Sequence, residues 1–407
     1  MSQRKTNTGG REATLSVIPG KFALSVGKPR LPEPVGFTWT KLTDVARIES
    51  GHTPSRAKEE YWNGPIPWIG IREATGNHGK TIYETSQSIT ELGLNNSSTR
   101  LLPAETVCLS RTASVGYVVK MGVPMATSQD FVNWVCGPEM SPTYLMYILM
   151  AEQDSVRRFS HGTTHQTMYY PEAKALNVLI PPRLKQDGIV EVLGALDEKI
   201  ATNTTRAATA KNLAEAYFLE AMRDASDEAV LGDVLALEYG KSLPATKRKP
   251  GNVDVYGSGG ISGTHNEALC EDPGVIVGRK GTAGAVHWAR RPFFPIDTTF
   301  YVVPKAVGVS QVFSYFLLRT LRLDEMNNDS AVPGLNRDEA HASRIRVPSE
   351  YRLRVFNDTA SVLFDLVAST ESENESLAST RDTLLPQLMS GKLRVKDAEK
   401  VLENAGV

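Results

Sequence analysis

The chain of 407 residues carries an internal repeat, and this repeat constrains its fold more than any other feature. The segment Val107–Val118 aligns with Val275–Val286 at an offset of 168 residues. An upstream block that begins at Leu42 recurs at an offset of 189, and a downstream block around Pro181 recurs at an offset of 167. Three blocks that recur in one order indicate a tandem duplication, so we expect two related modules rather than one large domain.

The two copies differ in the length of one loop region. The offset falls from 189 to 168 between the first and second blocks, so copy one has 21 additional residues between Gly51 and Val107. Two binding modules that share a scaffold and hold different ligands would differ in this way. Drift in a loop that has no function is the alternative interpretation.

Each copy combines a mixed globular part with a long helix. Short β-type runs, such as Phe300–Val303, lie between clusters of Gly, Pro and Asn and predict short strands. After Pro182, apolar or small residues recur every three or four positions, and a second stripe follows in copy two. This heptad pattern predicts two helices that pair with each other. The residues expected in the seam are Leu193, Leu196, Ile200, Asn203 and Tyr217 in the first helix, and Leu363, Leu366, Leu377 and Leu384 in the second.

The predicted fold class is α+β, with two tandem mixed α/β modules joined by two long helices. The helices are expected to form an antiparallel coiled coil with pseudo-twofold symmetry. The expected boundaries are a flexible leader over 1–35, a first globular domain over 36–182, a central helix over 183–225, a second globular domain over 226–348, a C-terminal helix over 349–395 and a tail over 396–407.

Composition excludes several classes of protein. Hydrophobic residues make up 41% and charged residues 22% of the chain, which is typical of a folded protein and not of a disordered one. No window approaches the roughly 18 apolar residues of a membrane span, and the N-terminus lacks the apolar core of a signal peptide. Three scattered cysteines are too few for a disulfide framework. We therefore expect a reduced, cytoplasmic protein with no membrane partner.

Charge is segregated along the sequence although the formal net charge is only −1. Basic residues are concentrated in the globular parts, and acidic residues are concentrated in the helices, for example over 371–375. Such segregation allows positive surfaces on a nearly neutral chain, where Lys and Arg would bind phosphates and polar loops would read base edges. The candidate DNA contacts are Arg56, Lys58, Arg72, Lys80, Arg111, His161, Thr163 and Gln166 in copy one, and Lys241, Lys247, Arg248, Lys249, Ser258, Arg279 and Lys280 in copy two.

Motifs for catalysis are absent or weak. The segment Gly240–Ser242 resembles the end of a phosphate-binding loop, but Leu235 stands where the first glycine should be. No HExxH motif occurs, and the seven histidines do not cluster with cysteines. Glu172 and Lys174 match the minimal ExK pattern of metal-dependent nucleases, which three residues can match by accident. The sequence therefore predicts no catalytic residue, no metal and no cofactor in this chain.

The ordered set of motifs resembles the specificity (S) subunit of type I restriction–modification systems. Each motif is moderately specific, and the set covers about residues 36–395. The similar segments are 39–45 with 51–54, which open a target recognition domain in the family, 162–168 and 330–336, which close the two domains, and 196–200 and 384–395 in the two helices.

The resemblance implies that each globular part is a target recognition domain that reads one half of a bipartite, asymmetric site in double-stranded DNA. The helices would set the spacing and dock methyltransferase (M) subunits, two in number, through the seam residues given above. Those subunits would use S-adenosylmethionine, and restriction (R) subunits would add ATP and Mg²⁺. Two alternatives stay open: a stand-alone nuclease or methyltransferase, and a coiled-coil scaffold that does not bind DNA.

Overall fold

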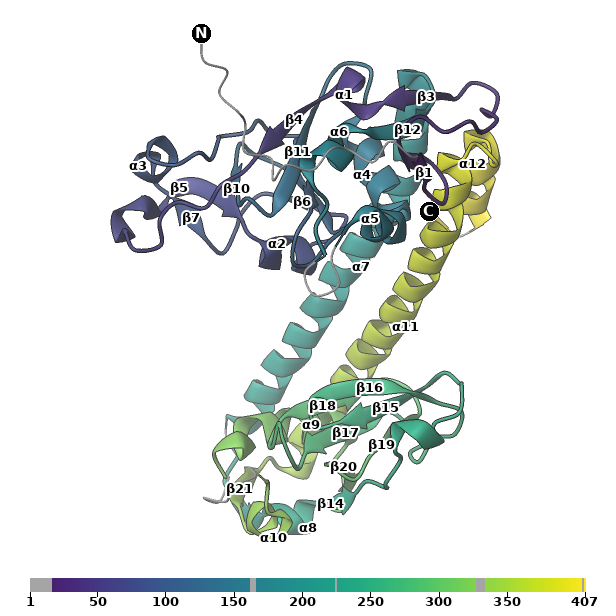
Figure 1. The fold of residues 1–407 in the computed structure, drawn as a ribbon. Coiled ribbons are helices and arrows are strands. Elements are labelled where there is room, and N and C mark those ends of the chain that lie inside the picture. The colour runs from purple at the N-terminus through teal and green to yellow at the C-terminus, as the bar shows by residue number, and fades with distance from the viewer. Residues whose placement is uncertain (1–16, 162–165, 224, 327–333, 405) are drawn as a thin grey trace. The chain divides into compact units, whose positions relative to one another are not determined.

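The computed structural model describes residues 17–161, 166–223, 225–326, 334–404 and 406–407. The chain divides into two compact units: unit 1 comprises residues 1–200 and 376–407, and unit 2 comprises residues 201–375. The long helices α7 (Arg183–Met222) and α11 (Glu350–Met389) each supply residues to both units (Figure 1). The predicted class, two mixed α/β modules with a pair of long helices, is confirmed.

Unit 1 is built around a five-stranded sheet of order β4–β11–β8–β9–β6, in which only β6 pairs in parallel. The residues of β8 and β9 are buried, as expected for short continuous apolar runs in the centre of a sheet. Helix α4 (Pro142–Ala151) packs on these two strands. The strands are β4 (Ala46–Ser50), β11 (Phe131–Cys136), β8 (Val107–Ser110), β9 (Val118–Met121) and β6 (Thr81–Ile82).

A second, three-stranded sheet of unit 1 carries the loop region that is longer in copy one. Its order is β10–β5–β7, with β10 parallel to β5. The strands are β10 (Ala126–Thr127), β5 (Trp62–Ile69) and β7 (Ser88–Ile89). Around them lie η1 (Glu59–Tyr61), α2 (Ile71–Gly76) and α3 (Glu91–Asn95).

The expected flexible leader over 1–35 does not hold for its second half. Strands β1 (Ile18–Pro19) and β2 (Leu24–Val26) extend a sheet of order β1–β2–β12–β3. Leu24 is 1% exposed, because this edge of the sheet packs on the core of unit 1. The other two strands are β12 (Leu176–Ile180) and β3 (Thr38–Lys41), and the latter leads into α1 (Leu42–Val45).

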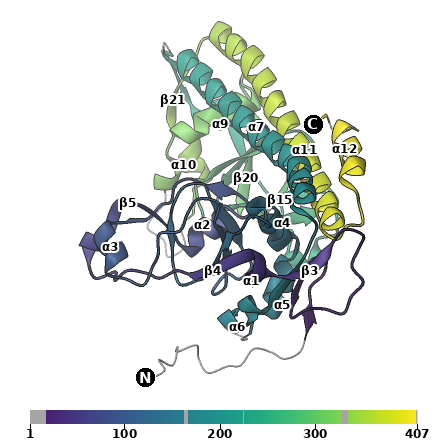
Figure 2. The ribbon, with the colours of Figure 1, turned by 90° about the horizontal axis from the view of Figure 1, so that it is seen from above.

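The expected tail over 396–407 is also folded. It forms α12 (Val395–Asn404), which lies beside the C-terminal end of α11 (Figure 2). Ala398 and Leu402 are buried in the core of unit 1. The heptad pattern of the sequence ends before this segment. A helix of ten residues is also too short for its apolar spacing to stand out in the sequence.

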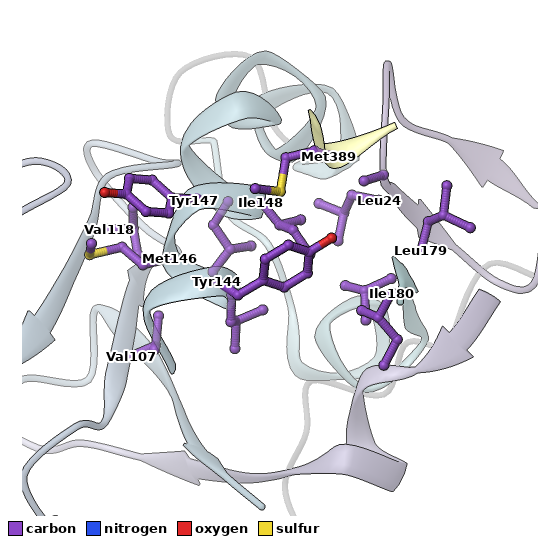
Figure 3. Close-up of a cluster of buried hydrophobic side chains, with 14 of the residues drawn as sticks. Leu24, Val107, Val118, Tyr144, Met146, Tyr147, Ile148, Leu179, Ile180 and Met389 are labelled. Carbon is purple, nitrogen blue, oxygen red and sulfur yellow. The ribbon is translucent and has the colours of Figure 1, made fainter. Parts of the chain in front are cut away.

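The core of unit 1 joins the sheets, α4 and the two long helices. Figure 3 shows Tyr144 and Ile148 of α4 close to Leu24 and to Met389 of α11. The expected seam residues Leu193, Leu196, Leu377 and Leu384 belong to this core and are at most 4% exposed, and Ile200 packs against it. The remaining helices of the unit are α5 (Gln153–Phe159) and α6 (Tyr170–Lys174).

Unit 2 repeats the strand order of unit 1. Its four-stranded sheet has the order β14–β20–β17–β18, which corresponds to β4–β11–β8–β9. The strands are β14 (Leu235–Tyr239), β20 (Thr299–Pro304), β17 (Gly274–Gly278) and β18 (Val286–Ala289). The three-stranded sheet consists of β16 (Gly260–His265), β15 (Val253–Gly257) and β19 (Phe293–Pro295), with β19 parallel to β15 as β10 is to β5.

The other elements of unit 2 complete the correspondence. Strands β13 (Asp227–Val230) and β21 (Arg344–Val347) form a two-stranded sheet, which lacks equivalents of β1 and β2. The leader therefore gives unit 1 two strands that have no counterpart among the described residues of unit 2. The helices are α8 (Leu231–Val234), η2 (Ala245–Lys247), α9 (Gln311–Thr320), η3 (Leu323–Glu325) and α10 (Arg337–His341).

The longer loop region of copy one lies mainly between two strands. Residues 70–87 connect β5 to β7 and contain α2 and β6. In unit 2 only residues 258–259 connect β15 to β16. The additional residues therefore enlarge the three-stranded sheet of unit 1 on the side of this connection.

The long helices pair antiparallel within unit 2, and one seam residue differs from the prediction. Asn203 Nδ2 donates to Glu373 Oε2 at 2.9 Å, and Arg352 lies 3.5 Å from Glu220. Asn203 is buried, and Leu363 and Leu366 pack against Ala207 and Ala210 as expected. Tyr217, by contrast, is 40% exposed, and Phe218 takes the buried position at 2%. The heptad pattern slips by one residue here, where Phe218 packs against Phe313 and Phe316 of α9 and Phe356 of α11.

Two histidines, His78 and His341, should make the stability of the protein depend on pH. His78 Nδ1 accepts from the Val118 amide at 3.1 Å, and His341 Nε2 accepts from the Leu237 amide at 2.9 Å. Burial, reinforced by nearby arginines, lowers the pKa of both imidazoles below the ordinary 6.5. The neutral forms therefore contribute stability that is present above pH 6.5 and is lost as pH falls through the lower folded-state pKa.

We expect the thermal midpoint of unfolding to decrease as the pH falls below 6.5. The decrease should be smaller in His78→Gln and His341→Gln, because the glutamine amide oxygen accepts the hydrogen bond but does not titrate. Identical pH profiles of the variants and the unaltered chain would contradict this account.

Candidate nucleic-acid interface

The candidate DNA contacts fall into an exposed group and a group that holds the fold together. Lys80 lies before β6, apart from the three-stranded sheet, and Lys58 donates to the Tyr61 hydroxyl at 3.1 Å. Thr163 lies outside the described residues. The exposed candidates are Arg56, Lys58, Arg72, Lys80, Gln166, Lys241, Lys247, Lys249 and Lys280.

Arg111 and Arg279 hold equivalent turns in the two units. Arg111 Nε donates to the Gln129 carbonyl at 3.0 Å, and Arg279 Nη1 donates to the Asp297 carbonyl at 3.2 Å. The main chain repeats this arrangement, since the Met168 amide donates to the Arg111 carbonyl as the Leu335 amide does to that of Arg279. Both guanidiniums are thus committed to positioning loops, which the sequence could not distinguish from DNA contact.

His161 and Gln166 lie next to the Arg111 turn. Thr167 bridges to both Thr112 and His161 in the main chain. Thr112 in turn donates to Asp130 at 2.5 Å. The structure therefore brings His161, Gln166 and Arg111 onto one side of unit 1, although they lie up to 55 residues apart in sequence.

A cleft of about 630 Å³ opens on unit 1 beside this turn. The helix α2 and the segment before β7, both part of the longer loop region, supply one of its walls. Arg56 and Arg72 both line it, and neither forms an ion pair with any carboxylate of the described residues. The other lining residues are Thr53, Trp68, Gly70, Ile71, Glu73, Ser86, Gln87 and Asp130.

In unit 2 the candidates surround the β15–β16 turn, with one correction. Ser258 is 6% exposed and its hydroxyl donates to the Thr298 carbonyl at 2.7 Å, so it is a buried structural residue in place of an exposed base reader. Arg248 Nη1 donates to the Ser262 carbonyl at 2.7 Å and is likewise committed within the unit. Lys247 and Lys249 flank it and remain exposed.

Lys241 and Lys280 approach the same part of unit 2 from other segments. The Lys241 amide donates to the Pro295 carbonyl at 3.1 Å, which fixes the start of its loop. Lys280 bridges to Gly334 in the main chain. An exposed tyrosine, Tyr239, lies between the Arg279 and Arg337 guanidiniums, at 4.8 and 5.0 Å from the ring centroid. Sequence reasoning missed Arg337, because only the fold brings α10 to the end of β14.

The acidic run of α11 pairs with two basic residues of unit 2, Arg290 and Arg291. Arg291 lies 3.3 Å from Glu375 and 3.0 Å from Asp254, and Arg290 lies 3.6 Å from Glu371 and contacts Glu375. These two arginines are thus paired with carboxylates, whereas Lys241, Lys247, Lys249 and Lys280 near the β15–β16 turn are exposed.

The described residues offer little for catalysis. They contain no group of three potential metal ligands. Glu172 is 1% exposed whereas Lys174 is exposed, so the ExK pattern does not form one surface site. Burial raises the pKa of the Cys136 thiol to about 12 and that of Cys270 to about 11, which leaves them as protonated, unreactive thiols. No helix within the described ranges is long and apolar enough to cross a membrane.

The family model for the type I restriction modification DNA specificity domain matches residues 34–212. This match covers the first module and most of α7, including the cleft and the Arg111 turn. The first module is therefore similar to the DNA specificity domains of type I restriction–modification systems.

Full-length relatives extend this assignment to both modules. The specificity subunit of the type I restriction enzyme MjaIX from Methanocaldococcus jannaschii is 23% identical over 403 residues, which cover 88% of this chain and 93% of the relative. The EcoprrI specificity subunit from Escherichia coli is 21% identical over 350 residues, or 79% and 86% of the two chains. The chain is a relative of the type I restriction–modification specificity subunits over most of its length.

A solved structure supports the same fold. The crystal structure of the type I restriction–modification system S subunit from M. genitalium superposes with a TM-score of 0.60 and 20% identity, over 89% of this chain and 98% of that one. The expected resemblance to type I specificity subunits is confirmed by these relatives.

Proposed function

We propose that the two modules of this specificity subunit each read one half of a bipartite, asymmetric DNA site. The observation that carries the proposal is the pair of equivalent frames with unequal loops. Both units hold their turns through the same main-chain bonds at Arg111 and Arg279, yet residues 70–87 have only residues 258–259 as their counterpart. Equal frames with unequal reading loops are what two different half-sites require.

The proposal includes the partners expected from the sequence. Helices α7 and α11 set the spacing between the half-sites and dock M subunits, which use S-adenosylmethionine, while R subunits add ATP and Mg²⁺. Each helix is one continuous element of 40 residues that enters both units, which supports a spacing role. The near-neutral chain then depends on its partners for many phosphate contacts, in the cytoplasm.

Methylation mapping tests this function. In cells that hold the chain and its M partner, we expect one methylated motif with two defined halves and a gap of fixed length. Removing two turns from each long helix should change the gap and leave both halves unaltered. Altered half-site sequences would contradict the spacing role, and the absence of a bipartite motif would contradict the function.

Purified chain distinguishes the two alternatives. Cleavage or methylation of DNA by the chain alone, with Mg²⁺ and S-adenosylmethionine, would favour a stand-alone enzyme. A DNA affinity that does not change with salt concentration would favour a scaffold without phosphate contacts, since each neutralised phosphate adds to the salt dependence.

A further inference from the structure

The cleft of unit 1 holds an arginine whose surroundings fix it in place without neutralising it. The Arg56 guanidinium lies 3.9 Å from the ring centroid of Trp62 and 5.2 Å from that of Trp68. Its Nη2 donates to the Gln87 side-chain carbonyl at 3.0 Å. Stacking on an indole orients the plane of a guanidinium and leaves its N–H edges free.

The same two tryptophans also hold the loop that carries Arg56. Trp62 Nε1 donates to the Ser55 carbonyl and Trp68 Nε1 donates to the His52 carbonyl, each at 3.2 Å. The His52 amide donates to the Thr127 carbonyl at 2.9 Å, next to Gly51, where a Cβ would lie 2.3 Å from that oxygen. The segment that leads into Arg56 is therefore held at His52 and Ser55 before any ligand arrives.

The acidic residues of the cleft are occupied by other partners. Glu73 accepts from the amides of Gly70 and Ser86, each at 3.2 Å, and from the Ser86 hydroxyl. Asp130 accepts from Thr112 at 2.5 Å and from Ser128 at 3.0 Å. These carboxylates consequently do not pair with Arg56, which keeps its charge and most of its donors for an external acceptor.

Neighbouring amides add to the donors of the cleft. The Gln87 carbonyl oxygen of the side chain accepts from Arg56, so its amide nitrogen faces outward as a donor. Thr53 donates to Gln129 Oε1 at 2.6 Å, which orients the Gln129 amide in the same way. In the major groove, guanine presents two acceptors, O6 and N7, and a bidentate arginine is its commonest partner.

We propose that Arg56, oriented by Trp62, Trp68 and Gln87, reads a guanine in the half-site recognised by unit 1. This inference rests on the proposed function, since it names one residue and one base within it. A contact to phosphate is the competing role for an arginine, and the two roles differ in what a substitution changes.

The test is methylation mapping of genomic DNA in cells that hold the M partner with the unaltered chain, Arg56→Gln, Arg56→Lys or the control Lys41→Gln. The control removes one positive charge from unit 1 at an exposed residue of β3, which neither lines the cleft nor belongs to the candidate DNA contacts. For Arg56→Gln we expect the preference for guanine at one position of one half-site to fall roughly 5- to 150-fold, with the other half and the gap unchanged. Lys41→Gln should leave the motif as it is.

Other outcomes would overturn the inference or the function separately. An unchanged motif in Arg56→Gln, or uniformly weaker methylation of all sites, would overturn the base contact. If Arg56→Gln abolished methylation, Arg56→Lys decides, because it keeps the charge but loses the bidentate geometry: relaxation at one position supports base reading, and an unchanged motif contradicts it. If the unaltered chain yields no bipartite motif, the proposed function fails first.

Discussion

Replacing Phe218 with alanine is expected to destabilise unit 2 by about 3–5 kcal/mol, among the largest effects of any single substitution in its core. Phe218 is 2% exposed and lies at the centre of an aromatic cluster. Its ring centroid is 5.5 Å from that of Phe313, 5.6 Å from Phe316 and 6.1 Å from Phe356. The cluster joins α7, α9 and α11, so a cavity there would loosen the module from both long helices.

Tyr217 provides the matched control on the same turn of α7. It is 40% exposed and belongs to none of the ring pairs around Phe218, so Tyr217→Ala should change the free energy of unfolding by less than about 1 kcal/mol. Urea denaturation of the full chain measures both variants. Equal losses, or a larger loss in Tyr217→Ala, would show that the heptad seam predicted from the sequence is right and that the observed slip is not.

The slip explains why the seam could be predicted only in part. At Leu193, Leu196 and Asn203 the heptad spacing and the burial agree, and the two leucines also pack in the module core of unit 1. Near Phe218 the partners are the rings of Phe313, Phe316 and Phe356, and the side chain that reaches them lies one residue from the position that the spacing predicts. The spacing of apolar residues shows that a helix has an apolar stripe, but it does not show which neighbouring elements this stripe packs against.

The loops that form the candidate site could be predicted from the sequence, but the contacts among their side chains could not. The repeat located the Arg111 and Arg279 turns, and the basic residues located Arg56. The roles of Gln87 and Trp62 had no signal, because a glutamine and a tryptophan acquire them only when the fold brings β7 and β5 beside the Arg56 loop. For Ser258, the residue type suggested an exposed side chain, but the fold buries it.

The leader is the element that sequence patterns missed most, and Glu152 explains how it is held. Glu152 lies between α4 and α5 and is 0% exposed. Its carboxylate accepts from the amides of Lys21, Phe22, Ala23 and Leu24, at 2.8, 2.5, 2.6 and 3.1 Å. The Glu152 carboxylate thus supplies hydrogen-bond acceptors for four amides that would have no partner at this edge of the sheet.

Replacing Glu152 with alanine should therefore cost more than about 3 kcal/mol, because a hydrogen bond to a charged group contributes roughly 1.5–3 kcal/mol and several amides would be left unpaired. Asp154→Ala is the matched control two residues along, since Asp154 is 82% exposed and pairs only with Arg157. Hydrogen exchange of residues 17–26 reports the release of the leader directly. Unchanged protection and stability in Glu152→Ala would contradict this role. Because α5 runs from Glu152 toward His161, release of the leader should also weaken methylation while leaving the recognised motif unaltered.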